Sequence, residues 1–244
     1  MAGFVDVHSH VVPSGDDGAQ TFEEGLALCR AAALRGTGVL FATPHVWPSL
    51  TLDAEREERV RATHAELAVS AAEAGLDLRL GWELTPMPRL LGEDLERYRL
   101  GDLPAVLMEV PFHGPLDLAE SLAEGIEACG LTPVIAHPER ARTVVEDVAA
   151  TERLHRPGRL LQVNATSLLG YHGPEVELTA WRLIDEGVVD LVASDGHRLA
   201  RPPFLDEAYD LVRTRVGERA TALFDGSALP TLAQRDRVDL AQRR

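Results

Sequence analysis

The stretch FVDVHSH, residues 4–10, begins as an apolar, strand-like run and ends in two histidines. Successive side chains of a β-strand alternate between its two faces, so His8 and His10 are predicted to point the same way. Two imidazoles on one face can chelate one metal ion. The stretch therefore indicates a first strand that ends in a candidate metal site.

Outward from this stretch, similar apolar runs recur along the chain, and each is followed by a segment with helical periodicity. The further runs are GVLFATPH (38–45), DLRLGWEL (77–84), AVLMEVPF (105–112), PVIAHPER (133–140), LLQVNAT (160–166) and VDLVASDGH (189–197). Seven such runs separated by helices are typical of parallel strands with crossover connections. The fold class is α/β, as an open doubly wound sheet or a closed barrel, and no linker divides the 244 residues into more than one domain.

Several helices have recognisable ends. A helix is predicted from Thr21, with Glu24 completing a capping box, to Gly36, and a long charged helix spans residues 51–75. Pro174 and Gly187 bracket another helix, while Asp117 and Thr143 each resemble a cap. The final stretch, residues 231–244, is predicted to be a surface helix or a frayed tail.

Composition excludes several function classes. A net charge of −15 argues against a nucleic-acid-binding surface, which needs basic patches. No run of about 18 apolar residues and no signal-peptide pattern occurs, so we expect a cytoplasmic protein without membrane insertion. The chain contains no lysine, which rules out lysine Schiff-base chemistry. Its two cysteines, Cys29 and Cys129, are too few for a disulfide framework, and both are expected to be buried.

Side chains that bind metals gather at the carboxyl ends of the predicted strands. Six of the seven strands carry them: His8 and His10, His45, Glu83, Glu109, His137, and Asp195 with His197. One such residue alone is more often a surface or capping residue, but buried imidazoles and carboxylates on six strands fit a metal-filled cavity. With Asp17, nine ligands without a thiolate favour two or three divalent ions, namely manganese, iron, zinc or magnesium.

These motifs resemble the PHP (polymerase and histidinol phosphatase) superfamily, through DVHSHVVPSGDDG, ATPH, GWEL, LMEVPF, VIAHPER and VASDGH. Within it, PVIAHPER and LLQVNATSLLGYHG look most like the bacterial manganese-dependent protein-tyrosine phosphatases of capsule and exopolysaccharide operons. The resemblance implies a distorted (β/α)7 barrel, manganese, and a trinuclear site on the nine residues named above. It also implies that Arg140 and Arg201 bind the substrate phosphate, for which the guanidinium fork is suited.

The resemblance implies a phosphoester hydrolase that cleaves phosphotyrosine by attack of a metal-activated hydroxide, with His45, Arg140 and Arg201 as catalytic residues. The expected partner is a phosphotyrosine protein, with a bacterial tyrosine autokinase as the candidate. Two alternatives stay open: a phosphatase or phosphodiesterase for small molecules such as histidinol phosphate, and a non-catalytic metal-binding module. The oligomeric state is not predicted.

A few further residues near the predicted site need separate interpretation. Trp47, in the loop after His45, stacks on a phosphotyrosine ring in one interpretation and packs against the protein in the other. Trp82 is expected to face away from the pocket, while His113 and His172 are expected to be solvated or locally hydrogen-bonded. Cys29 and Arg35 match the Cys-x5-Arg spacing of thiol-dependent tyrosine phosphatases, but the residues between them are strong helix formers. We expect that match to be accidental.

Overall fold

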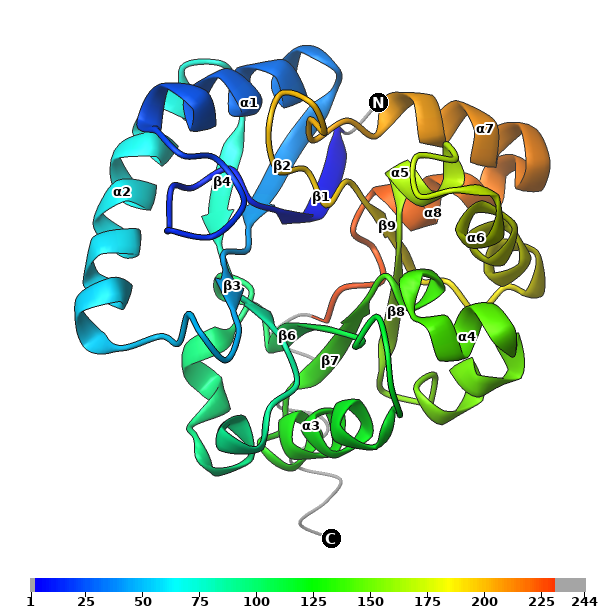
Figure 1. Cartoon of the computed structure of the whole chain (residues 1–244). Coiled ribbons are helices and arrows are strands. Elements are labelled where there is room, and N and C mark those ends of the chain that lie inside the picture. The colour runs from blue at the N-terminus through cyan, green and yellow to red at the C-terminus, as the bar shows by residue number, and fades with distance from the viewer. Residues whose placement is uncertain (1–2, 231–244) are drawn as a thin grey trace, which may run out of the picture.

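The computed structural model describes residues 3–230, which form a barrel of parallel strands surrounded by helices (Figure 1). The predicted tail at 231–244 lies outside the described residues. The strands are β1 (Phe4–Ser9), β2 (Thr37–Ala42), β3 (His45–Val46), β4 (Asp77–Leu80), β5 (Glu83–Leu84), β6 (Ala105–Glu109), β7 (Thr132–Ala136), β8 (Leu160–Asn164) and β9 (Leu191–Ala193).

The strands match the seven predicted runs, because β2 with β3 and β4 with β5 are each one run broken by a short kink. They form two parallel sheets, in the orders β1-β2-β4 and β3-β5-β6-β7-β8-β9. A parallel bridge between Ser9 and Gly196 joins the end of β1 to the chain after β9 and closes this side. β4 and β6 belong to different sheets and do not pair directly. Between them, the backbone nitrogen of Gly101 donates a hydrogen bond to the carbonyl of Leu80. The barrel is therefore closed but distorted, as expected.

Helices cover the outside of the barrel. They are α1 (Phe22–Leu34), α2 (Ala54–Ala72), α3 (Asp117–Ala128), α4 (Arg142–Glu146), α5 (Ala165–Leu168), α6 (Pro174–Glu186), α7 (Asp206–Val216) and α8 (Ala220–Phe224). Short 3-10 turns are η1 (Pro88–Gly92), η2 (Leu95–Tyr98), η3 (Pro138–Arg140), η4 (Val148–Arg153) and η5 (Gly217–Arg219). No helix among residues 3–230 has the length and apolar character needed to cross a membrane.

Most predicted helix ends are confirmed. Thr21 caps α1 by accepting a hydrogen bond from the backbone nitrogen of Glu24, and Gly187 ends α6 in the left-handed conformation. The caps predicted at Asp117 and Thr143 are wrong. Asp117 is the first residue of α3 and makes no capping bond, while the Thr143 hydroxyl lies inside α4 and donates to the carbonyl of Gly114.

Apolar side chains from facing strands fill the barrel beneath the strand ends. Val7, Phe41, Leu107, Val134 and Leu191 are fully or almost fully buried and belong to one cluster. Because side chains alternate along a strand, Leu107 lies on the same face of β6 as Glu109. The cluster therefore forms an apolar floor under the polar residues at the carboxyl ends of the strands.

Candidate metal centre

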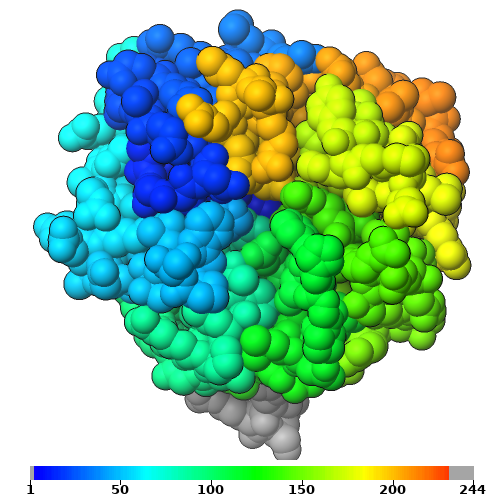
Figure 2. Space-filling model, in the orientation of Figure 1, coloured from blue at the N-terminus to red at the C-terminus, as the bar shows by residue number. Residues whose placement is uncertain are grey.

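A cavity of about 160 Å³ opens at the carboxyl ends of the strands, where function gathers in barrels of this kind. Figure 2 shows this face of the molecule, on which segments from distant parts of the chain meet around a central depression. The cavity is lined by Asp17, His45, Trp47, Glu109, Phe112, His137, Arg140, Asp195, His197 and Arg201. Nine of these ten residues were predicted site residues, the exception being Phe112.

Four side chains converge at the buried end of the site. The Nε2 atoms of His8 and His10 lie 3.2 Å apart, and Oε2 of Glu83 is 3.1 Å from the first and 3.2 Å from the second. Oδ1 of Asp195 lies 3.4 Å and 3.5 Å from the same two nitrogens. Two atoms that bind one ion at about 2.1 Å are roughly 3.0–3.4 Å apart at tetrahedral or octahedral angles. Each carboxylate oxygen therefore has, together with the two nitrogens, the spacing of ligands around one ion.

Glu83 connects this group to its neighbours. Its Oε1 lies 3.0 Å from Nε2 of His137, while Oε2 lies 2.9 Å from Nδ1 of His45. The side chain is fully buried. A carboxylate whose two oxygens face different imidazoles has the arrangement of a ligand that bridges two ions.

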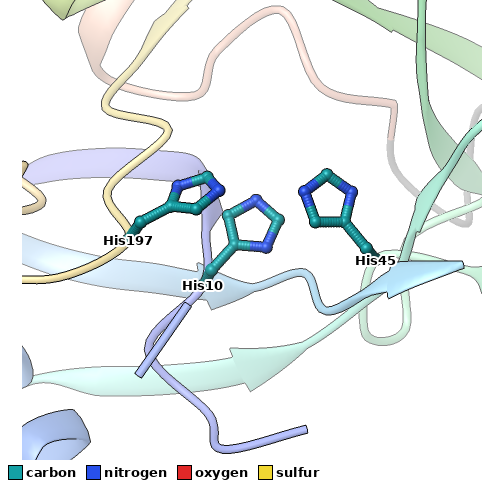
Figure 3. A group of neighbouring side chains, drawn as sticks. All are labelled: His10, His45 and His197. Carbon is teal, nitrogen blue, oxygen red and sulfur yellow. The ribbon is translucent and has the colours of Figure 1, made fainter. Parts of the chain in front are cut away.

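A second group of ligands lies nearer the opening. Figure 3 shows the ring of His10 between those of His45 and His197, with centroid distances of 4.3 Å and 3.9 Å. Oδ1 of Asp17 lies 3.5 Å from Nε2 of His45 and 3.3 Å from Nε2 of His197. Asp17 is 63% exposed, so this group is open to substrate and solvent in a way that the His8 group is not.

Glu109, at the end of β6, is the last of the nine predicted ligands. It receives a short hydrogen bond from the hydroxyl of Thr85 and lines the cavity. Burial, followed by the nearby charge of Glu83, raises the pKa of Glu109 to about 7. Two carboxylates that repel each other in a buried cavity are stabilised when a cation binds between them.

The backbone is strained at two of the predicted ligands. His137 and Asp195 have φ angles of 37° and 52°, and no other residue besides glycine has a positive φ within residues 3–230. Such conformations cost free energy and persist where the surrounding structure enforces them, often at functional sites. Next to Asp195, a Cβ on Gly196 would lie 2.6 Å from the backbone of Pro203. Only glycine lets the segment after β9 fold back over the site.

The pKa values of the histidines in the site are shifted in different directions. Burial alone would lower the pKa of His8, but Glu83 and Asp195 outweigh it and raise that pKa. Burial and the neighbouring His10 lower the pKa of His197 to about 4, and burial also lowers that of His137. Neutral imidazoles are the form that binds metals.

The donor set fits divalent metal ions. Oε2 of Glu83 and Nδ1 of His45 are buried and make no hydrogen bond, although they face each other. Three sets of three ligand atoms, each within 4.8 Å of one another, are formed by His10, His45 and His197, by His8, Glu83 and His137, and by His8, His10 and Asp195. Imidazole nitrogen and carboxylate oxygen without thiolate suit manganese, iron, zinc or magnesium.

Two arginines stand beside the ligands. Arg140 donates from Nη1 to Oδ2 of Asp195 at 3.0 Å, and Nη2 of Arg201 lies 3.7 Å from Oδ1 of the same residue. Arg201 also contacts Nδ1 of His197, and its buried Nε makes no hydrogen bond. Both line the cavity, so their free N–H groups are available to an anion there.

Aromatic side chains flank the cavity on two sides. Trp47 stacks on His45 with ring centroids 4.5 Å apart, and Phe112 packs 5.7 Å from His137 and under the guanidinium of Arg140. Phe112 is 40% exposed. Trp82 is buried and does not line this cavity, as expected. His172 shares a hydrogen bond with the Thr166 hydroxyl, which confirms a local partner for it.

Known proteins match this chain over most of its length. Residues 4–226 match the family model for capsular polysaccharide synthesis, CpsB/CapC. The chain belongs to the CpsB/CapC family. Tyrosine-protein phosphatase YwqE of Bacillus subtilis is 30% identical to it over 201 residues, which cover 80% of this chain and 78% of the relative. Tyrosine-protein phosphatase CpsB of Streptococcus agalactiae serotype III is 28% identical over 236 residues, covering 90% and 94%.

A solved structure of the CpsB/CapC family agrees with the barrel. It comes from work on YwqE from Bacillus subtilis and CpsB from Streptococcus pneumoniae, described as unique metal-dependent tyrosine phosphatases. The TM-score is 0.78 at 25% identity, and the match covers 92% of each chain. The predicted resemblance to bacterial tyrosine phosphatases of capsule operons is therefore confirmed at the level of the family.

The match of Cys29 and Arg35 to thiol-dependent phosphatases is accidental in this CpsB/CapC family member. Cys29 lies inside α1, and burial raises the pKa of its thiol to about 12. Arg35 instead pairs with Asp206 at 2.7 Å and with Glu207. The expectation that both cysteines are buried is wrong, because Cys129 follows the end of α3 and is exposed.

Sequence patterns did not point to every residue of the site. Asp16 is buried beside the predicted ligand Asp17, accepts a hydrogen bond from the backbone nitrogen of His45 and lies 3.5 Å from Nδ1 of His10. The two adjacent aspartates look equivalent in sequence, so only packing separates the buried one from the exposed one. Phe112 had no distinguishing feature beyond its place after the fourth strand.

Proposed function

We propose that this protein is a metal-dependent phosphatase that hydrolyses phosphotyrosine in proteins. The observation that carries the proposal is the convergence of buried imidazole and carboxylate ligands beside two arginines in one cavity. Its CpsB/CapC relatives, which are named tyrosine-protein phosphatases, support the choice of substrate.

The ligands divide into an inner and an outer group. The inner group would hold ions at the buried end of the site and consists of His8, Glu83, Glu109, His137 and Asp195. The outer group lies at the opening and consists of Asp17, His45 and His197, and His10 lies between the two groups. Two or three divalent ions, with manganese as the first candidate, would supply Lewis acidity and lower the pKa of water in the cavity. His45 contacts both groups of ligands, because its Nδ1 faces Glu83 of the inner group and its Nε2 faces Asp17 of the outer group.

Arg140 and Arg201 would bind the phosphoryl oxygens of the substrate. Each reaches the cavity from a different segment, so two guanidinium groups approach an anion from two sides. Their charge is permanent and their fork matches phosphate geometry. Because both also contact Asp195, they would couple the position of the phosphate to a ligand.

Trp47 would contact the tyrosyl ring once the phosphate is bound. It lies on the His45 side of the cavity, where a ring entering from solvent would meet an aromatic face. A phenolate is a good leaving group, since the phenol of tyrosine has a pKa of ~10, so protonation of the leaving oxygen demands little from the protein. These features favour an aryl phosphate over an alkyl phosphate.

The cellular setting follows from the same proposal. A cytoplasmic phosphotyrosine protein, such as a bacterial tyrosine autokinase, would be the partner, and capsule or exopolysaccharide synthesis would be the process. The family description of capsular polysaccharide synthesis supports this setting.

The test compares three substrates with the metal-depleted and the manganese-loaded protein. A phosphotyrosine peptide, histidinol phosphate and a phosphodiester are assayed by phosphate release. We expect manganese-dependent turnover with a clear preference for the phosphotyrosine peptide. Preference for either other substrate would replace the tyrosine assignment with another phosphoesterase, and metal binding without turnover would identify a non-catalytic module.

A further inference from the structure

β8 lies between β7 and β9 but brings no histidine or carboxylate to the site. Its last inward-facing residues are Gln162 and Asn164, two positions apart and therefore on one face of the strand. Both side chains are fully buried. A buried primary amide is costly unless its donors and acceptor are satisfied, so the partners of these two amides are informative.

The two amides form a continuous chain of hydrogen bonds between two predicted metal ligands. Nδ1 of His8 lies 2.9 Å from Oε1 of Gln162, and Nε2 of Gln162 donates to Oδ1 of Asn164 at 2.8 Å. Nδ2 of Asn164 then donates to Oδ2 of Asp195 at 2.7 Å. His8 and Asp195 are 187 positions apart in sequence, and the two amides of β8 connect the Nδ1 side of His8 to Oδ2 of Asp195.

The direction of every bond in this chain follows from its last member. An ionised carboxylate only accepts hydrogen bonds, so Asn164 must present its NH2 group to Asp195 and its oxygen to Gln162. Gln162 must then donate its own NH2 group to Asn164 and turn its oxygen toward His8. The remaining partner, Nδ1 of His8, must carry a proton. The carboxylate thus determines the tautomer of the histidine through the two amides.

This arrangement leaves the correct atoms free for a metal ion. With a proton on Nδ1, the lone pair of neutral His8 lies on Nε2, which faces Oε2 of Glu83 at 3.1 Å. Oδ2 of Asp195 is occupied by Asn164 and by Nη1 of Arg140, so Oδ1 is the oxygen that faces Nε2 of His8 and of His10. Hydrogen-bond partners of metal ligands commonly fix their orientation in this manner.

We propose that Gln162 and Asn164 are positioning residues that act as one directional relay, fixing the Nε2 lone pair of His8 and the Oδ1 atom of Asp195 toward a shared ion. Neither amide contacts the ion itself. The inference rests on the metal-binding part of the proposed function and not on the identity of the substrate.

The test measures metal affinity in a set of variants of the full chain. Gln162→Met keeps the length of the side chain but removes both hydrogen bonds, and Asn164→Leu keeps the shape of the amide without its polar atoms. Gln162→Glu restores the acceptor for His8 alone. Thr37→Val is the matched control, because Thr37 is buried on β2 and its hydroxyl has no hydrogen-bond partner.

Zinc and manganese titrations of the metal-free proteins are the main measurement. Gln162→Met is expected to weaken the tightest site by about 10–100-fold, and Gln162→Glu to recover part of that loss. Thr37→Val should bind as the wild type does.

In the zinc-loaded wild type, 15N NMR of the imidazoles should show His8 protonated at Nδ1 and bound through Nε2, with the signals assigned by comparison with His8→Gln.

The double variant Gln162→Met/Asn164→Leu separates a relay from two independent contacts. In a relay, loss of Gln162 already frees the amide of Asn164 to rotate, so the double variant should lose less affinity than the product of the two single losses. Multiplicative losses, wild-type affinity in Gln162→Met, or zinc bound through Nδ1 of His8 would each overturn the proposal.

If Gln162→Met does not fold, Gln162→Glu and Asn164→Leu decide by their affinities and by the NMR tautomer. A protein that binds metal as described but releases no phosphate from phosphotyrosine would contradict the proposed function and leave the relay intact.

Discussion

Oε2 of Glu83 lies 2.9 Å from Nδ1 of His45, and both atoms are buried without a hydrogen bond. Two ligand atoms that bind one ion at about 2.1 Å lie roughly 3 Å apart, so this nitrogen and this oxygen are placed to bind the same ion from one side. Nδ1 of His10 and Nδ1 of His137 are likewise buried without a hydrogen bond. A divalent ion would satisfy these atoms together.

Removal of metal should therefore destabilise the fold as well as the activity. A ligand that binds only the folded state adds about 2.7 kcal/mol at a concentration 100 times its Kd. We expect the Tm of the protein to fall after chelation and to rise again with added manganese, measured by calorimetry. A Tm that is the same with and without bound metal would show that the ligands are not coupled to folding.

The thiol of Cys29 should have no part in catalysis. Because burial raises its pKa to about 12, the thiolate is scarce at every pH below about 10, and iodoacetamide should modify exposed Cys129 but not Cys29 in the native protein. Mass spectrometry of peptides identifies the modified residue. Cys29→Ala should keep turnover within about twofold, whereas His45→Ala should abolish it. The reverse pattern would eliminate the metal mechanism.

Arg140→Lys should weaken substrate use without removing the metal. Lysine keeps the positive charge but loses the planar fork, and we expect kcat/KM to fall by about 10–100-fold, which corresponds to about 1.4–2.8 kcal/mol. Arg142→Lys is the control, because Arg142 is exposed and pairs with Glu146 on α4. Metal content by elemental analysis accompanies the kinetics. An equal loss in both variants would show that Arg140 does not bind the phosphate.

Aromatic contacts should affect aryl substrates selectively. Trp47→Ala and Phe112→Leu are each expected to lower kcat/KM for a phosphotyrosine peptide by about 3–10-fold, since ring pairs contribute about 0.5–1.5 kcal/mol. Turnover of an alkyl phosphate should change little. If both substrates lose activity in parallel, the two rings support the site and do not select the substrate.

Gly196→Ala should disturb the segment that carries His197 and Arg201. The added Cβ would lie 2.6 Å from the backbone of Pro203, and overpacking of this kind costs about 1–3 kcal/mol. Gly92→Ala is the control, because a Cβ there meets no atom within 4 Å. Chemical denaturation of both variants gives the difference in unfolding free energy. A Gly196→Ala variant as stable as Gly92→Ala would show that the segment moves freely.

Much of this barrel can be predicted from its sequence because the pattern repeats. Each strand is a short apolar run, and ligands at successive strand ends, such as His45 and Glu83, meet in space whenever parallel strands close on one another. Helix ends at Thr21 and Gly187 follow from local chemistry that packing does not override.

Features that depend on packing were not predictable. The kink that separates β2 from β3 and the left-handed backbone of His137 and Asp195 arise from tertiary contacts and leave no mark in the apolar pattern. The roles of Gln162 and Asn164 depend on hydrogen bonds across the barrel, and amides in a strand carry no signature of their own in sequence. The caps predicted at Asp117 and Thr143 failed because both residues lie inside their helices, and the Thr143 hydroxyl donates to the carbonyl of Gly114.

The central claim is that bound divalent ions in this cavity make the protein a phosphotyrosine phosphatase. Titration of the metal-free protein with manganese, followed by phosphate release from a phosphotyrosine peptide, tests it most directly. Activity should be absent without metal and should rise to a plateau at about two to three equivalents of manganese. Full activity in the metal-free protein, or saturated metal binding with no release of phosphate, would contradict the claim.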